Sequence, residues 1–414
     1  MLNLYRLLIN LVLLISPFIL IFRLIKKKED LYRFKEKFCF FDKKKTNGKL
    51  VWFHGSSVGE ILSIIPLIEK LEKNKSINKI LITSSTLSSS KVLTKFKLKK
   101  TLHQFFPIDT NFFTKKFLNY WNPSVAIFIE SEIWPNMLVN IKKKSIPLLL
   151  LNARLTKKSY KKWKIISFFS NYLFNCFDKI FPQNNETKKY LSFLGVKKMK
   201  LLGNLKFSET KTQKNINLNK NIQKNFKSRK LWCAVSTHDG EEKMCAEVHK
   251  KLKKKYKNLL TIIIPRHIHR SNQLYQQIID MGLNVQIHSK KNKVKKETDI
   301  YLVDTYGETK SFLKLCSTVF LGGSIVNHGG QNPLEAARFG CEIFHGPNVQ
   351  NFTEVYKLLQ KEKLTHKFYN TNQLVKYINK DLNKNINYSK KITKLKKIGS
   401  SILNQTLKEI NSFL

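Results

Sequence analysis

Negative charge is scarce in this 414-residue sequence: 28 Asp and Glu stand against 76 Lys and Arg, which gives a formal net charge of +48. Such a balance favours an anionic partner, either nucleic acid or a membrane surface. Zinc-finger spacing, an RNP-like aromatic motif and a basic heptad array are all missing, so nothing marks a nucleic-acid site. Because nearly all of the charge is Lys spread along the whole chain, we expect anionic lipids and no nucleic acid as partners.

Paired cysteines are missing as well. We expect the cysteines to be small buried side chains in a reducing compartment, and we expect no metal site. The hydrophobic fraction of 42% excludes wholesale disorder, and the length allows two α/β domains with full cores. The six cysteines, which form no Cys-x-x-Cys pair and have no metal-ligand spacing with His, are Cys39, Cys176, Cys233, Cys245, Cys316 and Cys341.

One long apolar run lies near the start of the chain. Residues 7–22 are almost entirely apolar, and Arg23 and a Lys cluster at 26–28 follow them. No small-residue cleavage site follows, so we predict an uncleaved membrane anchor at residues 1–26. The run covers roughly 24 Å as a helix against about 30 Å of hydrocarbon, so it either spans the bilayer, with Arg6 and Arg23 reaching the headgroups, or inserts part way. The basic cluster places the remaining chain on the cytoplasmic side.

Short apolar runs alternate with helical patterns along the rest of the chain, which is typical of βαβ units in a parallel sheet. Hydrophobicity falls at 209–229, so we place a linker there, between an N-terminal domain at 27–208 and a C-terminal domain at 230–414 that ends in helices. Near-continuous apolar runs are typical of strands buried on both faces. We expect strands at 51–53, 79–84, 125–129, 146–151, 180–183 and 200–204, and then at 231–235, 259–264, 284–287, 300–303 and 318–321.

The first strand of the N-terminal domain leads into a turn of small residues and then into a helix. Glu60 stands where the turn enters that helix. The carboxyl ends of parallel strands form the edge at which open α/β sheets bind ligands. Glu60 therefore has two interpretations: it complements the helix dipole, or it projects into the ligand site as a general base. Glu130 follows the strand at 125–129 and is expected at the same edge.

The corresponding edge of the C-terminal domain is rich in glycine. A strand runs into glycine pairs at 322–323 and 329–330, after which Asn332 suits an N-cap and Pro333 the first helical position. A helix start of this kind is a phosphate site by geometry, and Glu335 in its first turn can take a ribose hydroxyl. The plain alternative is a tight turn with a dipole-stabilising Glu.

Three further polar loops follow strands of this domain, so four loops converge on one edge. Arg266 is one of few arginines in a chain that otherwise uses Lys. This choice indicates planar, bidentate recognition of phosphate or carboxylate, with a solvated surface arginine as the alternative. The three loops are Ser236–Glu242, Pro265–His267 and Asp304–Glu308.

Seven motifs in this order resemble the Kdo transferases, the bacterial 3-deoxy-D-manno-octulosonic acid transferases of lipopolysaccharide assembly. The resemblance runs from the apolar run to about residue 350 and departs from the family pattern at Gly55, Ser56 and Gln331. Gln331 stands where the family often has His. The motifs are His54–Glu60, Glu130–Asn136, Asn152–Leu155, Gly203–Lys206, Ser236–Glu242, Pro265–His267 and Gly329–Glu335.

The resemblance implies an inverting glycosyltransferase of the GT-B type, with two Rossmann-like domains that face each other across a cleft. It implies CMP-Kdo as the donor on the C-terminal domain and a lipid A precursor, lipid IVA, as the acceptor on the N-terminal domain, at the bacterial inner membrane. By this resemblance, Glu60 occupies the position of the family's general base. Glu130 and Lys206 occupy the positions of residues that stabilise the transition state. An Asp-x-Asp manganese motif is absent, which agrees with transfer that needs neither metal nor cofactor. Donor contacts fall on Arg266, His267, Tyr306, Gly307, Glu308, Asn332, Pro333, Leu334 and Glu335.

Two other functions stay open on the sequence. Another GT-B envelope transferase, using a UDP-sugar, would share the fold, the anchor and the glycine-rich loop, but it would not need the motif at 130–136. A membrane-tethered basic protein that binds nucleic acid would account for the charge. It predicts binding that weakens steeply with salt and does not depend on Glu60.

Overall fold

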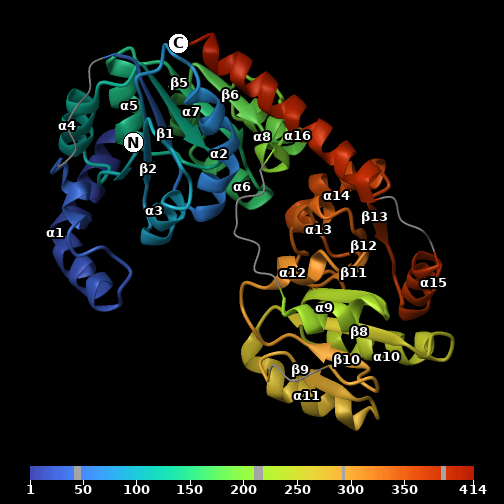
Figure 1. Cartoon of the computed structure of the whole chain (residues 1–414). Coiled ribbons are helices and arrows are strands. Elements are labelled where there is room, and N and C mark those ends of the chain that lie inside the picture. Colours follow the sequence, from blue (N-terminus) through green and yellow to red (C-terminus); the bar gives the residue numbers. More distant parts are fainter. Residues whose placement is uncertain (42–47, 209–217, 291–293, 384–387) are drawn as a thin grey trace. The chain divides into compact units, whose positions relative to one another are not determined.

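The computed structural model describes residues 1–41, 48–208, 218–290, 294–383 and 388–414. The chain divides into two compact units, one made of Met1–Gln213 and Ile398–Leu414 and the other of Lys214–Lys397. Each unit is an α/β fold around one parallel sheet (Figure 1), as the sequence predicts. All six cysteines are buried and unpaired, also as predicted.

The sheet of the first unit has the strand order β3-β2-β1-β4-β5-β6, which is that of the Rossmann fold. The order reverses between β1 and β4, where Val51 pairs with Val125, and this switch point is where such sheets bind ligands. The central strands are continuous apolar runs because helices cover both of their faces. The strands are β1 (Leu50–His54), β2 (Lys79–Ser84), β3 (Thr101–Phe105), β4 (Val125–Ile129), β5 (Leu148–Ala153) and β6 (Lys179–Pro182).

The helices of the first unit enclose a core in which Trp52, Phe117 and Trp121 are buried. Five of these helices begin at a Ser, Thr or Asn whose side chain accepts a backbone N–H of the first turn, so the sequence itself fixes where they start. The elements are α2 (Val58–Leu71), α3 (Leu87–Leu93), α4 (Asn111–Trp121), α5 (Pro135–Lys143), α6 (Lys157–Ile165), α7 (Ser167–Phe174) and α8 (Asn185–Phe193), with 3-10 turns η1 (Phe34–Phe38) and η2 (Leu205–Ser208).

The sheet of the second unit has seven parallel strands in the order β13-β12-β11-β7-β8-β10-β9. Its core includes Trp232, Phe320 and Phe344. The strands are β7 (Lys230–Thr237), β8 (Leu259–Pro265), β9 (Val285–Ile287), β10 (Ile300–Leu302), β11 (Thr318–Leu321), β12 (Glu342–His345) and β13 (Thr365–Lys367). The helices are α9 (Lys220–Lys227), α10 (Glu241–Lys253), α11 (Ser271–Asp280), α12 (Thr309–Leu313), α13 (Leu334–Arg338), α14 (Thr353–Lys361) and α15 (Thr371–Leu382), with 3-10 turns η3 (Ile268–Arg270) and η4 (Gln350–Phe352).

Two sequence predictions about extended and linker segments are wrong. The stretch 200–204 is not a strand, and only Met199 beside it forms an isolated bridge, with Ile180. The predicted linker at 209–229 begins outside the described residues, but its second half forms α9. Phe226 of α9 is fully buried and its ring contacts the ring of Tyr301 at 5.1 Å, so α9 belongs to the core of the second unit.

The C-terminal boundary also differs from the prediction, because residues 398–414 belong to the first unit and not to the second. They form the end of α16 (Tyr388–Asn411), where Glu409 pairs with Lys179 at 2.6 Å and with Lys200 at 2.5 Å. A Cβ at Gly399 would lie 2.3 Å from the carbonyl oxygen of Phe207. Only glycine therefore allows α16 to pack this closely against η2.

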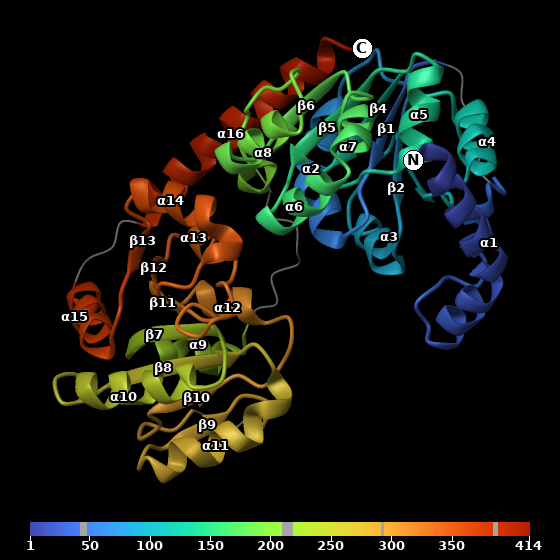
Figure 2. The same ribbon diagram turned by 180° about the vertical axis from the view of Figure 1, so that it is seen from behind.

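The apolar run at the start of the chain forms α1 (Leu2–Ile25), which is long and apolar enough to cross a membrane. Its first turn is fixed to the first unit: the Tyr5 hydroxyl donates to Asp109 Oδ2 at 2.8 Å, and Arg6 Nε donates to Asn136 Oδ1 at 2.9 Å. Arg23 at the other end pairs with Glu29 at 2.6 Å. Both arginines are thus paired with protein groups, and their predicted contact with headgroups stays a prediction. Figure 2 shows α1 from the opposite side.

Candidate functional site

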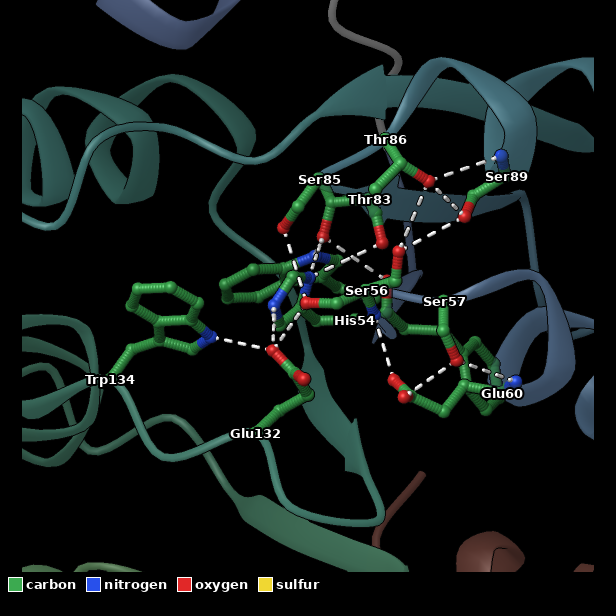
Figure 3. Close-up of polar contacts among 12 residues, drawn as sticks. His54, Ser56, Ser57, Glu60, Thr83, Ser85, Thr86, Ser89, Glu132 and Trp134 are labelled. Atoms are coloured by element: carbon green, nitrogen blue, oxygen red, sulfur yellow. Dashed lines mark hydrogen bonds and ion pairs between the residues drawn. The ribbon is translucent and has the colours of Figure 1, made fainter. Parts of the chain in front are cut away.

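The turn between β1 and α2 places Glu60 at the carboxyl edge of the first sheet. Ser57 is the N-cap of α2, and its hydroxyl accepts the backbone N–H of Glu60 and donates to Glu60 Oε1 at 2.7 Å. Glu60 Oε2 accepts the backbone N–H of Ser56 at 2.8 Å (Figure 3). This reciprocal pattern is a capping box, which the spacing Ser-x-x-Glu specifies. Glu60 thus stabilises the start of α2 while its carboxylate faces the edge of the sheet.

The surroundings of Glu60 shift its pKa. Burial raises its pKa above the usual range, hydrogen bonds from Ser57 and Ser56 oppose the rise, and the nearby carboxylates of Glu132 and Glu130 add to it. Among the residues that the structure describes, no Lys, Arg or His pairs with Glu60. A carboxylate with a raised pKa and no cationic partner is suited to accept a proton.

Glu132 is the centre of a second network at the same edge (Figure 3). Its Oε2 accepts hydrogen bonds from Ser56 Oγ at 2.7 Å and from Trp134 Nε1 at 2.7 Å, and it contacts His54 Nε2 at 3.0 Å. Burial alone would raise the pKa of Glu132, but these three partners outweigh it, so the pKa lies below its usual range. Glu132 is therefore held ionised and orients Ser56. The sequence pointed to this motif but assigned Glu132 no role.

Glu130 and Lys206, which the sequence predicts as a functional pair, form an ion pair at 2.5 Å between Nζ and Oε1. Asn152 connects the two segments, because its Nδ2 donates to Glu130 and its Oδ1 accepts the backbone N–H of Leu205. Glu130 and Asn152 both have left-handed backbones, with φ of 57° and 53°. Left-handed non-glycine residues are energetically costly and cluster at functional sites. Here they turn both strand ends toward η2.

The carboxyl edge of the second sheet carries cationic and imidazole side chains instead. His238 follows β7, and its ring lies 4.2 Å from that of His328 and 5.8 Å from that of His267. Gln331 Nε2 contacts His238 Nε2 at 3.3 Å. Burial lowers the pKa of His238, and the neighbouring His328 lowers it further. The side chain of Arg266, exposed at the end of β8, has no hydrogen-bond or ion-pair partner in the described part of the chain.

The backbone N–H groups after the first glycine pair are bound by a carboxylate of the chain itself, whereas the phosphate site predicted at the helix start after Asn332 stays a prediction. Glu241, fully buried in the first turn of α10, accepts the backbone N–H of Gly323 at 2.7 Å, of Ser324 at 3.0 Å and of Ile325 at 2.9 Å. It also accepts the backbone N–H of His238 at 2.9 Å. The chain's own carboxylate thus fills this concavity and fixes the loop beside His238. Sequence reasoning missed Glu241 because an acidic residue in a first helical turn has an ordinary explanation in the helix dipole.

The predicted donor residues Tyr306, Gly307 and Glu308 lie in the loop between β10 and α12. Glu308 caps α12 and contacts His288 and Thr305, so its carboxylate is engaged within the protein. Tyr306 in this loop is 71% exposed, and Gly307 has a left-handed backbone. These residues make no contact with Arg266 or His267 among the interactions described.

The helix that follows the second glycine pair, α13, starts one residue later than predicted. Asn332 Oδ1 accepts the backbone N–H of Leu334 at 3.1 Å, and Pro333 occupies the N-cap position. Leu334 is buried in the core, whereas Glu335 is half-buried and pairs with Lys310 at 3.5 Å. Because Gln331 contacts His238, this segment is the part of the prediction that adjoins the histidine cluster.

Known proteins are similar to this chain in sequence and in fold. Residues 32–209 match a family model described as 3-deoxy-D-manno-octulosonic-acid transferase (kdotransferase). A 3-deoxy-D-manno-octulosonic acid transferase of Rickettsia bellii is 32% identical and aligns over 100% of both chains. One from Haemophilus influenzae is 29% identical over 75% of this chain and 73% of its own length.

Solved structures show the same two-unit architecture. A UDP-GlcNAc 2-epimerase from Neisseria meningitidis, bound to UDP-GlcNAc, has a TM-score of 0.55 and 14% identity, and the match covers 87% of this chain and 100% of that one. This likeness, together with the two parallel sheets, confirms the predicted pair of Rossmann-like domains of the GT-B type. The full-length match to the Rickettsia bellii enzyme decides the family. The chain belongs to the 3-deoxy-D-manno-octulosonic acid transferases, a family of glycosyltransferases.

Proposed function

We propose that this protein transfers Kdo from CMP-Kdo to a lipid A precursor in lipopolysaccharide assembly. Family membership supports Kdo as the transferred sugar. The observation that supports the chemistry is Glu60, a carboxylate with a raised pKa at the switch edge of the first sheet and no cationic partner in the described residues. A base of this kind can accept a hydroxyl proton near neutral pH.

In the proposed reaction, Glu60 takes the proton from an acceptor hydroxyl as the hydroxyl oxygen bonds to the anomeric carbon of Kdo. The bond from that carbon to the CMP phosphate oxygen breaks, its electron pair stays on the phosphate, and the anomeric configuration inverts. Arg266, exposed and without a partner in the described structure, neutralises the departing phosphate, with His267 and His238 beside it. Fixed positive groups of this kind stabilise developing charge without a metal ion or a cofactor.

Lys206 and Glu130 have a supporting role in this proposal. Their ion pair, at 2.5 Å, is held by Asn152, which donates a hydrogen bond to Glu130. Glu130 lies close enough to Glu60 to raise the pKa of Glu60 further. Glu130 supplies negative charge at the edge where the sugar's anomeric centre gains positive charge, and Lys206 holds the Glu130 carboxylate in place. We assign both to stabilisation of the transition state.

The acceptor is assigned to the first unit and the donor to the second. The first unit carries α1, which is long and apolar enough to cross a membrane, and this supports a lipid acceptor on that unit. The excess of Lys over acidic residues supports attraction to anionic lipids. We propose the cytoplasmic side of the bacterial inner membrane as the location, with α1 as the attachment.

The test incubates the full-length protein in mixed micelles with CMP-Kdo and a tetra-acylated lipid A precursor, and measures added Kdo by mass. Transfer that requires CMP-Kdo supports the proposal. Transfer only from a UDP-sugar would identify another envelope glycosyltransferase. Tight, salt-steep binding to nucleic acid without any transfer would support the basic binding protein instead.

A further inference from the structure

A cavity of about 170 Å³ lies directly behind Glu130 in the first unit. The apolar part of its lining includes Ile133, Leu155, Trp163, Phe174 and Leu191. The polar part is of similar extent and includes Glu130, Ser131, Ser159, Thr187 and, at the rim, the exposed Arg154. The cavity therefore opens where the proposed reaction takes place.

The size and lining of the cavity select the kind of ligand. An apolar protein cavity of roughly 150 Å³ holds one benzene ring, so this one has room for a short hydrocarbon segment. The aliphatic and aromatic side chains of the lining fit the end of an acyl chain.

Arg154 at the rim points to an anionic group on the same ligand. It is exposed and has no hydrogen-bond or ion-pair partner within the described residues, and its backbone is fixed by Glu130 and Ser131. In this lysine-rich chain every other arginine except Arg266 is held by a protein group: Arg6, Arg23, Arg33, Arg229, Arg270 and Arg338. The planar guanidinium suits phosphate, which it can bind in a bidentate way.

The outer surface next to the cavity is suited to a lipid surface. Helix α6, which contributes Trp163 to the wall, has the sequence KKSYKKWKI and no buried residue. At its end Ile165 is 83% exposed, and Phe168 at the start of α7 is 89% exposed. Lysines beside exposed large apolar side chains are typical of surfaces that contact anionic membranes.

We infer that this cavity is an acyl-chain subsite of the acceptor, with Arg154 binding a phosphate of the same lipid. The inference rests on the proposed function, in that it gives the lipid acceptor its place on the first unit. It makes the acceptor's acyl chain part of the recognition, so that a deacylated phosphosugar would bind more weakly than the intact lipid.

The first arm of the test fills the cavity. Ser159→Phe, from a half-buried position of α6 that lines it, should raise the KM for the acylated acceptor 10- to 50-fold, since each methylene kept in water changes an equilibrium roughly fourfold. The KM for CMP-Kdo should stay unchanged. Ser192→Phe makes the same replacement at an exposed position of α8 and should leave both constants unchanged. Equal KM values for Ser159→Phe and the wild type would overturn the subsite.

The second arm detects acyl binding without turnover. Trp163 lines the cavity, so acceptor with brominated acyl chains should quench its fluorescence, and Trp163→Phe should remove that part of the quenching. Thermal melting of Ser159→Phe establishes that the variant is folded. Quenching that is identical in the wild type and Trp163→Phe would contradict the inference.

The third arm tests binding of the lipid phosphate separately from binding of the acyl chain. Arg154→Gln should raise the KM for the phosphorylated acceptor about tenfold or more, because charged hydrogen bonds are the strong ones, and Arg154→Lys should restore part of it. An increase in the KM for CMP-Kdo instead would assign Arg154 to the donor and overturn its role here. Absence of transfer by the wild type would refute the proposed function, whereas wild-type transfer with insensitive variants refutes only this subsite.

Discussion

The carboxyl edges of the two sheets have the same construction and opposite charge. Each has a strand that ends in a left-handed non-glycine residue, Glu130 in the first unit and Ser236 in the second. The first edge then presents the carboxylates of Glu60 and Glu132 beside the Glu130 ion pair, whereas the second presents His238 and Arg266. The fold supplies the edge, and the side chains placed on it determine whether the edge takes up protons or holds an anion.

The two edges also share a feature that departs from the usual dinucleotide-binding Rossmann site, in which backbone N–H groups face a phosphate. In both units a carboxylate of the chain accepts those N–H groups: Glu60 accepts that of Ser56, and Glu241 accepts those of Gly323, Ser324 and Ile325. The loops are therefore fixed before any ligand arrives. The three N–H groups of Gly323, Ser324 and Ile325 are therefore not available to an anion.

The largest expected effect tests the proton-accepting edge. Glu60→Gln keeps the shape of the capping box but cannot accept a proton, so single-turnover transfer should fall on the order of 10² to 10⁴-fold. CMP affinity should not change, because Glu60 belongs to the first unit. Glu69→Gln at the far end of α2 is the matched control. Near-normal turnover in Glu60→Gln would reduce Glu60 to a cap and leave Glu130 as the next candidate base.

The pH dependence of the same variant follows from the raised pKa of Glu60. The wild-type rate should rise with pH through that pKa, because only the ionised carboxylate accepts a proton. Stability should change in the opposite direction: the protonated form is favoured in the folded state, so this contribution is full below the usual Glu pKa of about 4.3 and is lost as pH rises through the folded value. Both dependences should be absent in Glu60→Gln.

The next effect tests whether Glu241 is a structural substitute for phosphate. Glu241→Gln places an amide NH₂ against backbone donors, which should cost roughly 2 to 3 kcal/mol and lower the Tm of the second unit by about 4 to 12 °C. The measurement is calorimetry with CMP titration. Tighter CMP binding by Glu241→Gln would mean that Glu241 competes with the ligand for the loop, contrary to our interpretation.

Arg266→Ala tests the carboxyl edge of the second sheet, which we propose binds an anion. Hydrogen bonds to charged groups contribute about 1.5 to 3 kcal/mol, so the Kd for CMP should rise roughly 10- to 150-fold. Binding of the lipid acceptor alone should stay the same. Lys257→Ala, which removes a positive charge before the start of β8, is the control for net charge. Equal effects of the two substitutions would show that Arg266 acts only through the overall field.

The smallest effect tests a difference in how the two edges are supported. Lys206 lies on η2, which packs against Gly399 of α16, whereas α16 contacts the second unit through Lys391, which pairs with Glu342 at the start of β12, away from the carboxyl edge. A methyl group 2.3 Å from the Phe207 carbonyl oxygen should cost about 1 to 3 kcal/mol in Gly399→Ala and lower kcat, with CMP binding unchanged. Ser400→Ala is the neighbouring control. Unaltered melting and turnover in Gly399→Ala would show that η2 adjusts to the contact without affecting Lys206.

The sequence predicted most of the central strands, because strands such as β4 and β5 are continuous apolar runs with no helical alternative of that length. It missed β3, β12 and β13, which are short and carry polar residues such as His103, Glu342 and Lys367. Such strands are recognisable only once a neighbour provides the hydrogen bonds. Conversely, the apolar run after Lys200 pairs with nothing.

The site was predicted as far as local patterns extend. The position of Glu60 at the start of a helix and the scarcity of Arg both pointed to residues that the structure places at strand ends. The contact between Glu241 and the glycine loop, 82 residues away, has no local pattern. The same holds for residues 398–414: buried Ile402 and Ile410 indicate an amphipathic helix, but their spacing does not identify the domain that the helix covers.

The return of the C-terminal segment to the first unit has a consequence for synthesis in the cell. The ribosome adds roughly 5 to 20 residues per second, so on the order of 10 to 40 s separate residue 208 from the end of the chain. During that interval β6 and η2 lack the cover of α16, and the second unit is itself still being synthesised until residue 397. We expect the nascent first unit to expose apolar surface over this time and to be a client for chaperones. A product that ends at residue 397 would have a complete second unit and an incomplete first unit.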